Sequence, residues 1–132
     1  MTPFHWREYL IEATGLGLFM VTAATMTTVL EHPASPLRLA LPDPFVRRVF
    51  MGLAMGLTAA SLIYSPWGRR SGAHFNPAVT LTFLRLGKVS RRDASFYAAA
   101  QFAGGVLGIA AAAGVLWPWI ADSSVAYVAT PS

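Results

Sequence analysis

Cysteine is missing from the 132-residue sequence, so no disulfide, thiol nucleophile or thiolate metal ligand is available. The three histidines, His5, His32 and His74, lie far apart and have no acidic companions at ligand spacing, so neither a metal site nor a cofactor is expected. Charge is also scarce: 12% of residues are charged, against about 25% in an ordinary soluble domain. With 55% hydrophobic residues and a mean hydropathy of +0.49, the chain lacks the polar groups to cover a water-exposed exterior.

Groupings of catalytic side chains are missing as well. The sequence contains no nucleophile–base pair, carboxylate dyad or phosphate-binding loop at catalytic spacing, so an enzyme is not expected. The net charge of +4 at first suggests a nucleic-acid partner. The basic residues, however, occur as pairs and short clusters between long apolar runs, a distribution that sets the orientation of membrane proteins. The expected partner is therefore the lipid bilayer, with no nucleic acid.

Three apolar stretches have the length of membrane spans: residues 9–30, 45–65 and 94–120. As a helix, the first would reach roughly 33 Å, enough for a hydrocarbon core of about 30 Å. This length and Glu12 near the start argue against the alternative of a signal peptide. Residues 31–44 contain four prolines, which predict an extended loop without regular helix. The final residues, 121–132, are loop-like.

Pairs of glycines recur at helix-packing intervals on two of these spans. Gly52 and Gly56 are four residues apart on the second span, as are Gly104 and Gly108 on the third. In lipid, small residues at this spacing let helix backbones approach closely. The pattern predicts close helix packing without selecting the partner helix.

A helix too short to cross the membrane lies between the second and third spans. Residues 76–86 would reach roughly 16 Å, about half of a bilayer core. Asn76 suits the N-cap and Pro77 the first helical position. Basic residues flank the segment on both sides, so both flanks belong on the same, cytoplasmic face. We therefore expect residues 71–86 to enter the membrane as a re-entrant loop and to leave it as a half-helix. An amphipathic helix on the membrane surface is the less favoured alternative.

The basic residues also predict an orientation. With the N-terminus inside, seven of the ten Lys and Arg side chains are cytoplasmic, and Arg38, Arg47 and Arg48 lie outside. Such an excess predicts an integral membrane protein with a cytoplasmic N-terminus. The plasma (inner) membrane is the expected location.

The sequence SGAHFNPAVT, residues 71–80, resembles the first signature of the aquaporin and glycerol-facilitator family, the major intrinsic proteins. The resemblance continues at Glu12, at residues 56–58 and at Gln101, and covers nearly the whole chain. It matches the first three spans and the first re-entrant half-helix of the family's six-span plan. The implied fold is an all-α membrane protein with three transmembrane helices and one re-entrant half-helix, forming a single aquaporin-like half over residues 1–132.

The resemblance implies a channel for passive transport of water or small uncharged solutes such as glycerol. The positive dipole end of the half-helix would face the pore centre and oppose the passage of cations. Asn76 would donate hydrogen bonds to the solute, while Pro77 and Ala78 would pack the tip of the half-helix. Carbonyl oxygens would line the approach, from Gly72, Ala73, His74 and Phe75. For His74, a pore-lining side chain is an equal alternative to a role of its carbonyl alone.

Three further positions carry expectations from the resemblance. Glu12 would accept backbone N–H bonds from the re-entrant loop, and Gln101 would be a second support. The alternative for Glu12 is a side chain that snorkels to the interface. Met55 occupies the place where the family's filter usually has an aromatic residue, so a wider or differently shaped pore is expected.

The family builds its pore from two inverted repeats, and this sequence matches one of them. The favoured interpretation is a half-channel that needs a complementary second half, either encoded separately or lost by truncation. An inverted homodimer is possible but is opposed by the charge bias, and the family is tetrameric. The alternative of a different class is a non-conducting truncated membrane protein that only associates with other channel subunits.

Overall fold

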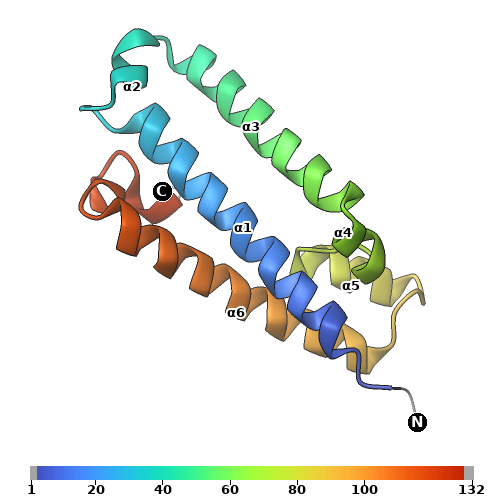
Figure 1. Ribbon diagram of the computed structural model, residues 1–132. Coiled ribbons are helices and arrows are strands. Elements are labelled where there is room, and N and C mark those ends of the chain that lie inside the picture. Colours follow the sequence, from blue (N-terminus) through green and yellow to red (C-terminus); the bar gives the residue numbers. More distant parts are fainter. Residues whose placement is uncertain (1–2, 130–132) are drawn as a thin grey trace.

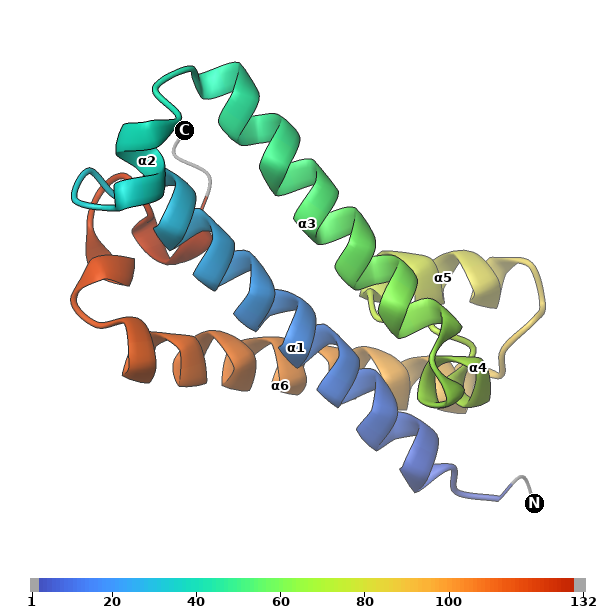
Figure 2. The ribbon, with the colours of Figure 1, turned by 45° about the horizontal axis from the view of Figure 1, so that its top comes forward.

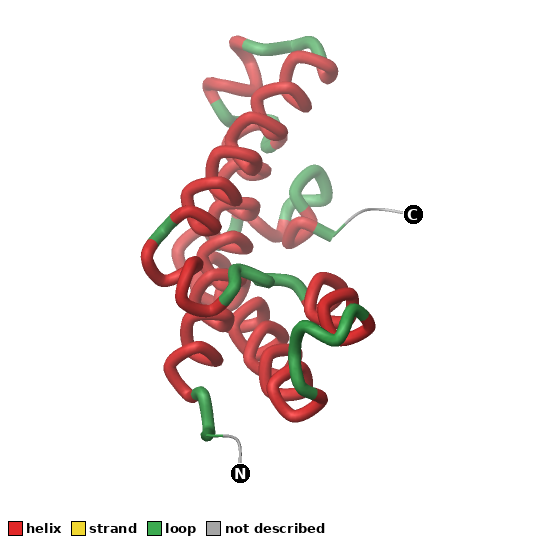
Figure 3. Tube along the Cα trace, turned by 90° about the vertical axis from the view of Figure 1, so that its right-hand side faces the viewer, coloured by secondary structure: helices red, strands yellow, loops and turns green. Residues whose placement is uncertain are grey.

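The computed structural model describes residues 3–129, and within this range the chain contains only helices and loops (Figure 3). Three helices are long and apolar enough to cross a membrane: α1 (Trp6–Glu31), α3 (Pro44–Tyr64) and α6 (Arg91–Leu116). The short helices are α2 (Pro36–Ala40), α4 (Pro66–Ser71) and α5 (Pro77–Arg85), with two 3₁₀ turns, η1 (Trp119–Ala121) and η2 (Ala126–Val128). The fold is therefore the all-α membrane architecture that the sequence predicted.

Helix α1 lies between α3 and α6 and packs against both (Figure 1). Its contact with α6 is the closest, because small residues from both helices meet where they cross (Figure 2). Two glycines on α6 leave no room for a side chain: a Cβ on Gly104 would collide with the backbone of Ala13, and one on Gly108 would lie 2.5 Å from the carbonyl oxygen of Gly17. The close helix packing that the spacing of Gly104 and Gly108 predicts is therefore confirmed.

The glycine pair on α3 behaves differently. A Cβ added to Gly52 or Gly56 would meet no atom of the described chain within 4 Å. The expectation of close packing at this pair is therefore not met within residues 3–129. Within residues 3–129, Arg47 is the only residue of α3 that is buried. Helix α3 presents most of its surface outward.

Four of the helices within residues 3–129 begin at a proline, and this explains why one prediction was wrong. Residues 31–44 were expected to contain no regular helix, yet Pro36 starts α2 and Pro44 starts α3. Proline lacks the N–H that the first helical position leaves unpaired anyway, and its fixed φ suits that position. Pro66 likewise starts α4 in the segment that follows the second span, and Pro77 starts α5.

The third span ends earlier than expected. Helix α6 stops at Leu116 instead of continuing to residue 120, because Pro118 cannot continue it. The chain then forms η1 and η2, where residues 121–132 were expected to be loop-like; residues 130–132 lie outside the described range. Ile120 and Val125 are buried against Ala24 and Ala112, so this segment packs on the α1–α6 pair.

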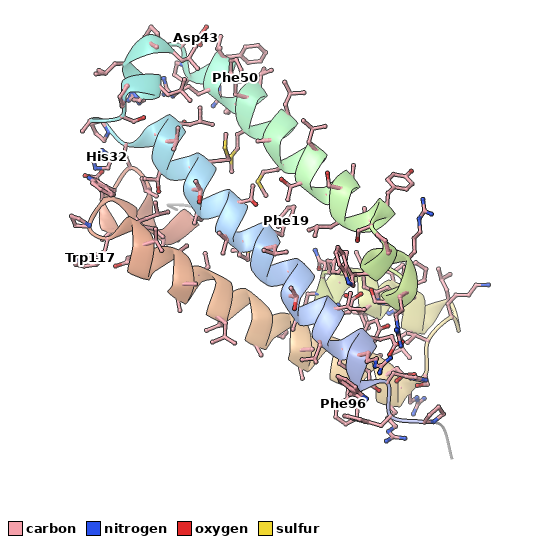
Figure 4. The ribbon with its side chains drawn as sticks, in the orientation of Figure 1. Phe19, His32, Asp43, Phe50, Phe96 and Trp117 are labelled. Atoms are coloured by element: carbon pink, nitrogen blue, oxygen red, sulfur yellow. The ribbon has the colours of Figure 1, made fainter. Side chains whose placement is uncertain are left out.

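Polar contacts fix both ends of the bundle. At the N-terminal end, Asp93 of α6 accepts hydrogen bonds from Tyr9 at 2.5 Å and His5 at 3.0 Å. At the other end, which Figure 4 marks with His32 and Trp117, His32 Nε2 lies 3.8 Å from Asp122. The hydroxyl and amide of Ser124 bind Asp122 and hold the pKa of its carboxyl below its usual range.

Arg47 is 4% exposed and holds the start of α3. Its Nε donates to Glu31 at 3.2 Å, and its Nη1 donates to the carbonyl oxygens of Leu41 and Pro42 at 2.9 Å each. Arg47 therefore joins the end of α1 to the beginning of α3.

Candidate pore-lining site

The segment between α4 and α5 folds back into the bundle as a loop with an unusual backbone. Gly72, Ala73 and Phe75 adopt positive φ angles of 90°, 52° and 47°. Positive φ is strained for residues that carry a Cβ, so Ala73 and Phe75 hold this shape only because other contacts determine it.

Glu12 of α1 supplies those contacts. Its Oε1 accepts the backbone N–H of His74 at 3.1 Å, and its Oε2 accepts that of Phe75 at 2.6 Å. Oε1 also accepts the hydroxyl of Ser71 at 2.7 Å. Glu12 is fully buried, so it does not snorkel to the interface. One carboxylate thus satisfies consecutive amides of the loop and turns their N–H groups toward α1.

The loop carbonyls are left free by this arrangement. No donor in residues 3–129 forms a hydrogen bond with the carbonyl oxygen of residues 72–75, although the amides of residues 73–75 are all paired. Backbone acceptors are stable at membrane depth only where they meet water or another polar partner. The loop thus carries a row of acceptors that have no partner within residues 3–129.

A buried polar network continues from Glu12 to the other helices. Gln101 of α6 is fully buried, and its Nε2 donates to Glu12 at 2.9 Å and to Thr80 of α5 at 3.0 Å. Tyr97 donates its hydroxyl hydrogen to the carbonyl of Ser71 at 2.6 Å. The network links α1, α4, α5 and α6, so the position of the re-entrant loop depends on all four.

The side chain of His74 belongs to this packing. Its Nδ1 lies 2.9 Å from the hydroxyl oxygen of Thr80, and its ring stacks on Phe83 with centroids 4.7 Å apart. Tyr97 packs edge-on against the same ring at 5.0 Å. The imidazole is therefore held by α5 and α6, while the carbonyl of His74 stays among the unpaired acceptors.

Asn76 caps the half-helix α5. Its Oδ1 accepts the N–H of Ala78 at 2.8 Å, which leaves the side-chain Nδ2 without a partner in the described chain. Asn76 and Ala78 are exposed, and Pro77 is half-buried at the first helical position. The N-terminus of α5, with its positive dipole end, therefore carries a free amide donor.

Phe75 fixes the loop from the other side. Its ring lies directly on Gly15 of α1, where any Cβ would collide with it. The space for the ring thus depends on a glycine at position 15.

A cavity of about 210 Å³ runs beside the loop. It is lined by Phe19 of α1, by Ala59 and Ile63 of α3, and by Ala73 and Asn76. Figure 4 shows Phe19 between α1 and α3. Met55 is half-buried one helical turn before Ala59, and it is not among the residues that line this cavity.

Among the residues that hold the loop in place, sequence reasoning missed three: Gly15, Thr80 and Tyr97. Thr80 had a usable signal, since it is a polar residue on an apolar half-helix that must pack against Gln101. Gly15 and Tyr97 had none, because their partners lie far away in the sequence.

Comparison of the sequence with known protein families places the chain in one of them. The sequence model of the major intrinsic protein family matches residues 1–130 of the chain. The chain belongs to the major intrinsic protein family. It is thus an integral membrane protein of a family of channels.

Individual relatives agree with this assignment. The chain is 35% identical over 106 residues to aquaglyceroporin AqpS of Rhizobium meliloti, covering 80% of this chain and 42% of that protein. It is 33% identical over 110 residues to human aquaporin-1, covering 83% and 39%, and 39% identical over 93 residues to aquaporin Z of Photorhabdus laumondii, covering 70% and 38%. The chain spans about two fifths of the length of these relatives. No solved structure matches it significantly.

Proposed function

We propose that this chain forms one half of a passive channel for water or small uncharged solutes such as glycerol, and that a second half completes the pore. The main observation behind this proposal is the hydrogen bonding of the re-entrant loop. Glu12 binds its amides, and the carbonyls of residues 72–75 have no partner within residues 3–129. A solute with hydroxyl groups would pass from one carbonyl to the next. A single row of carbonyls would not surround an ion and replace its hydration shell, as rings of carbonyls do in potassium channels.

The tip of the half-helix supplies the opposite polarity. Asn76 would donate through Nδ2 to a passing oxygen, while the dipole of α5 opposes cations. Pro77 and Ala78 would pack this tip, and Glu12 and Gln101 would support the loop. The carbonyl of His74 is its proposed contribution, because its side chain is already bound by Thr80. Met55 would shape the pore at the next turn of α3.

Two features support the need for a second half. The exposed tip at Asn76 has no facing half-helix within residues 3–129, and α3 shows open space at Gly52 and Gly56. Small residues with open space allow another helix to approach closely. The second half could lie in another chain, in another copy of this chain, or in a longer form of the same protein. We also propose a cytoplasmic N-terminus, location in the plasma (inner) membrane, and assembly into a homo-oligomer.

The competing function is that of a non-conducting membrane protein that only associates with channel subunits. The sparse packing of α3 favours association of some kind, and conduction separates the two possibilities. In association alone, Asn76 has no role.

The test is osmotic shrinkage of proteoliposomes measured by stopped-flow light scattering. The chain is reconstituted alone and together with the C-terminal half of a relative, each with Asn76 and with Asn76→Leu. Thr82→Val serves as the control, because Thr82 is exposed on α5 and bonds only within its own helix. We expect fast shrinkage in the paired sample, abolished by Asn76→Leu and retained in the control.

Conduction by the chain alone, again abolished by Asn76→Leu, would show that copies of this chain complete the pore. If neither sample shrinks faster than empty liposomes although both halves are inserted and associated, the channel proposal fails and the non-conducting function stands.

A further inference from the structure

Two cavities lie along the N-terminal half of α1, and the proposed path of the solute uses neither. The first, of about 330 Å³, is almost entirely apolar and is formed mainly by Leu10, Ile11, Thr14, Leu18, Leu62 and Trp67. The second, of about 280 Å³, is polar and is lined by Phe4, His5, Trp6, Arg7, Glu8 and Arg70. The same two helices, α1 and α4, contribute to both cavities.

The two cavities follow one face of α1. Arg7, Ile11, Thr14 and Leu18 are spaced by four, three and four residues, which places them in a single stripe along a helix. Arg7 therefore lies on the same face of α1 as the residues of the apolar groove, one helical turn before Ile11. On α4, Trp67 lines the groove and Arg70 lines the polar cavity, so the second helix repeats the arrangement.

The polar cavity has an excess of positive charge. Arg70 Nε binds Glu8 at 3.0 Å, yet its side chain remains 49% exposed and retains other N–H donors. Arg7 is exposed and lies over the ring of Trp6 at 5.2 Å, with no carboxylate partner in residues 3–129. The cavity thus holds two guanidinium groups and one carboxylate, and that carboxylate pairs with Arg70.

We propose that these cavities together bind one anionic phospholipid. Arg7 and Arg70 bind the headgroup phosphate, because guanidinium groups match phosphate oxygens in charge and geometry. One acyl chain lies in the groove between α1 and α3. Trp6 and Trp67, both more than half exposed, lie at the level of the headgroup, where amphipathic rings are favoured. A phospholipid has an anionic headgroup for the polar cavity and an acyl chain for the apolar groove, whereas a free anion would leave the groove empty.

Quenching of tryptophan fluorescence by brominated lipid tests this proposal. The background variant carries Trp117→Phe and Trp119→Phe, so that Trp6 and Trp67 are the only reporters. Vesicles of phosphatidylcholine contain equal fractions of either brominated phosphatidylglycerol or brominated phosphatidylcholine. We expect stronger quenching by phosphatidylglycerol, with a relative affinity of about fivefold, as one basic side chain near the surface provides.

Three variants locate the site. Arg7→Gln should bring the relative affinity close to one, whereas the matched control Arg85→Gln removes an exposed charge from the end of α5 and should leave it unchanged. Thr14→Phe fills the groove and should lower quenching by either lipid. Circular dichroism checks that all variants keep the same helix content.

Several results would overturn the proposal. One is equal quenching by the two lipids in the background variant. Another is an equal loss with Arg7→Gln and Arg85→Gln, which would show diffuse attraction to a basic surface. Removal of the preference by inorganic phosphate would show an anion site without an acyl chain. Quenching that rises only as the protein is diluted in lipid would show a second copy of the chain in the groove.

Discussion

The two sides of α1 differ sharply. Toward α6 and the re-entrant loop, small residues bring backbones into contact, and Glu12 binds four donors in the interior. Toward α3, the glycines face open space, and Arg47 is the one residue of that helix buried within the described chain. Identical glycine spacing therefore has two outcomes, decided by whether the chain supplies a partner helix. The packed side positions the loop, and the outward face of α3 is where we propose that a second half docks.

The largest effect is expected from Glu12→Ala. Removing the carboxylate leaves two loop amides, the Ser71 hydroxyl and the Gln101 amide without an acceptor, at about 1 kcal/mol or more for each donor. We expect the free energy of unfolding to fall by about 4 kcal/mol, with a smaller change in solute selectivity. Unfolding by SDS in mixed micelles measures it. Unchanged stability and conductance would remove the proposed support of the loop.

Gly104→Val and Gly56→Val form the sharpest comparison of the two sides. At Gly104 the new side chain must displace the backbone of α1, which should cost about 3 kcal/mol. At Gly56 it enters open space, and we expect a change within about 0.5 kcal/mol. The same SDS titration applies to both variants. Equal losses would mean that α3 is packed as tightly as α6.

The sequence predicts the features that depend on neighbouring residues and misses those that depend on contacts between distant segments. The three spans, the half-helix and its cap at Asn76 follow from local patterns, since apolar length, proline at the first helical position and an N-cap residue act within a few residues. The prediction that residues 31–44 contain no regular helix was wrong because a proline that ends one helix can also begin the next. The short helices α2 and α4 arise in this way.

Long-range contacts account for what the sequence could not predict. The Phe75 ring on Gly15 and the Tyr97 hydroxyl on Ser71 join residues 60 and 26 positions apart. Whether a glycine pair is packed or open depends on neighbours that its own helix does not encode. Arg47, whose partners include the end of α1, could not be distinguished from Arg48 by sequence.

Arg47→Leu tests the polar attachment of α3 to the end of α1. Its loss removes an ion pair with Glu31 and two bonds to loop carbonyls, so the free energy of unfolding should fall by about 2 kcal/mol. The adjacent Arg48 is exposed, and Arg48→Leu should have almost no effect. Thermal unfolding in detergent compares the pair. Similar losses for both would contradict the assigned role of Arg47.

Thr80→Val is expected to have the smallest effect on the packed side. The change keeps the shape of the side chain but removes the oxygen that binds Gln101 and His74, at about 1 kcal/mol. Thr82→Val on the exposed face of α5 is the control and should be neutral. SDS unfolding of the two variants measures the difference. A neutral Thr80→Val would show that the polar network ends at Gln101.

The central claim is that the re-entrant loop meets water at its tip although it lies between membrane spans. The absence of native cysteine permits clean single-cysteine labelling of the membrane-reconstituted chain with a charged, water-soluble thiol reagent. Asn76→Cys should react readily, whereas Val106→Cys, exposed on the outer surface of α6 in the apolar middle of that helix, should not. Asn76→Cys as unreactive as Val106→Cys would place the tip in lipid or in a dry interior and contradict the account.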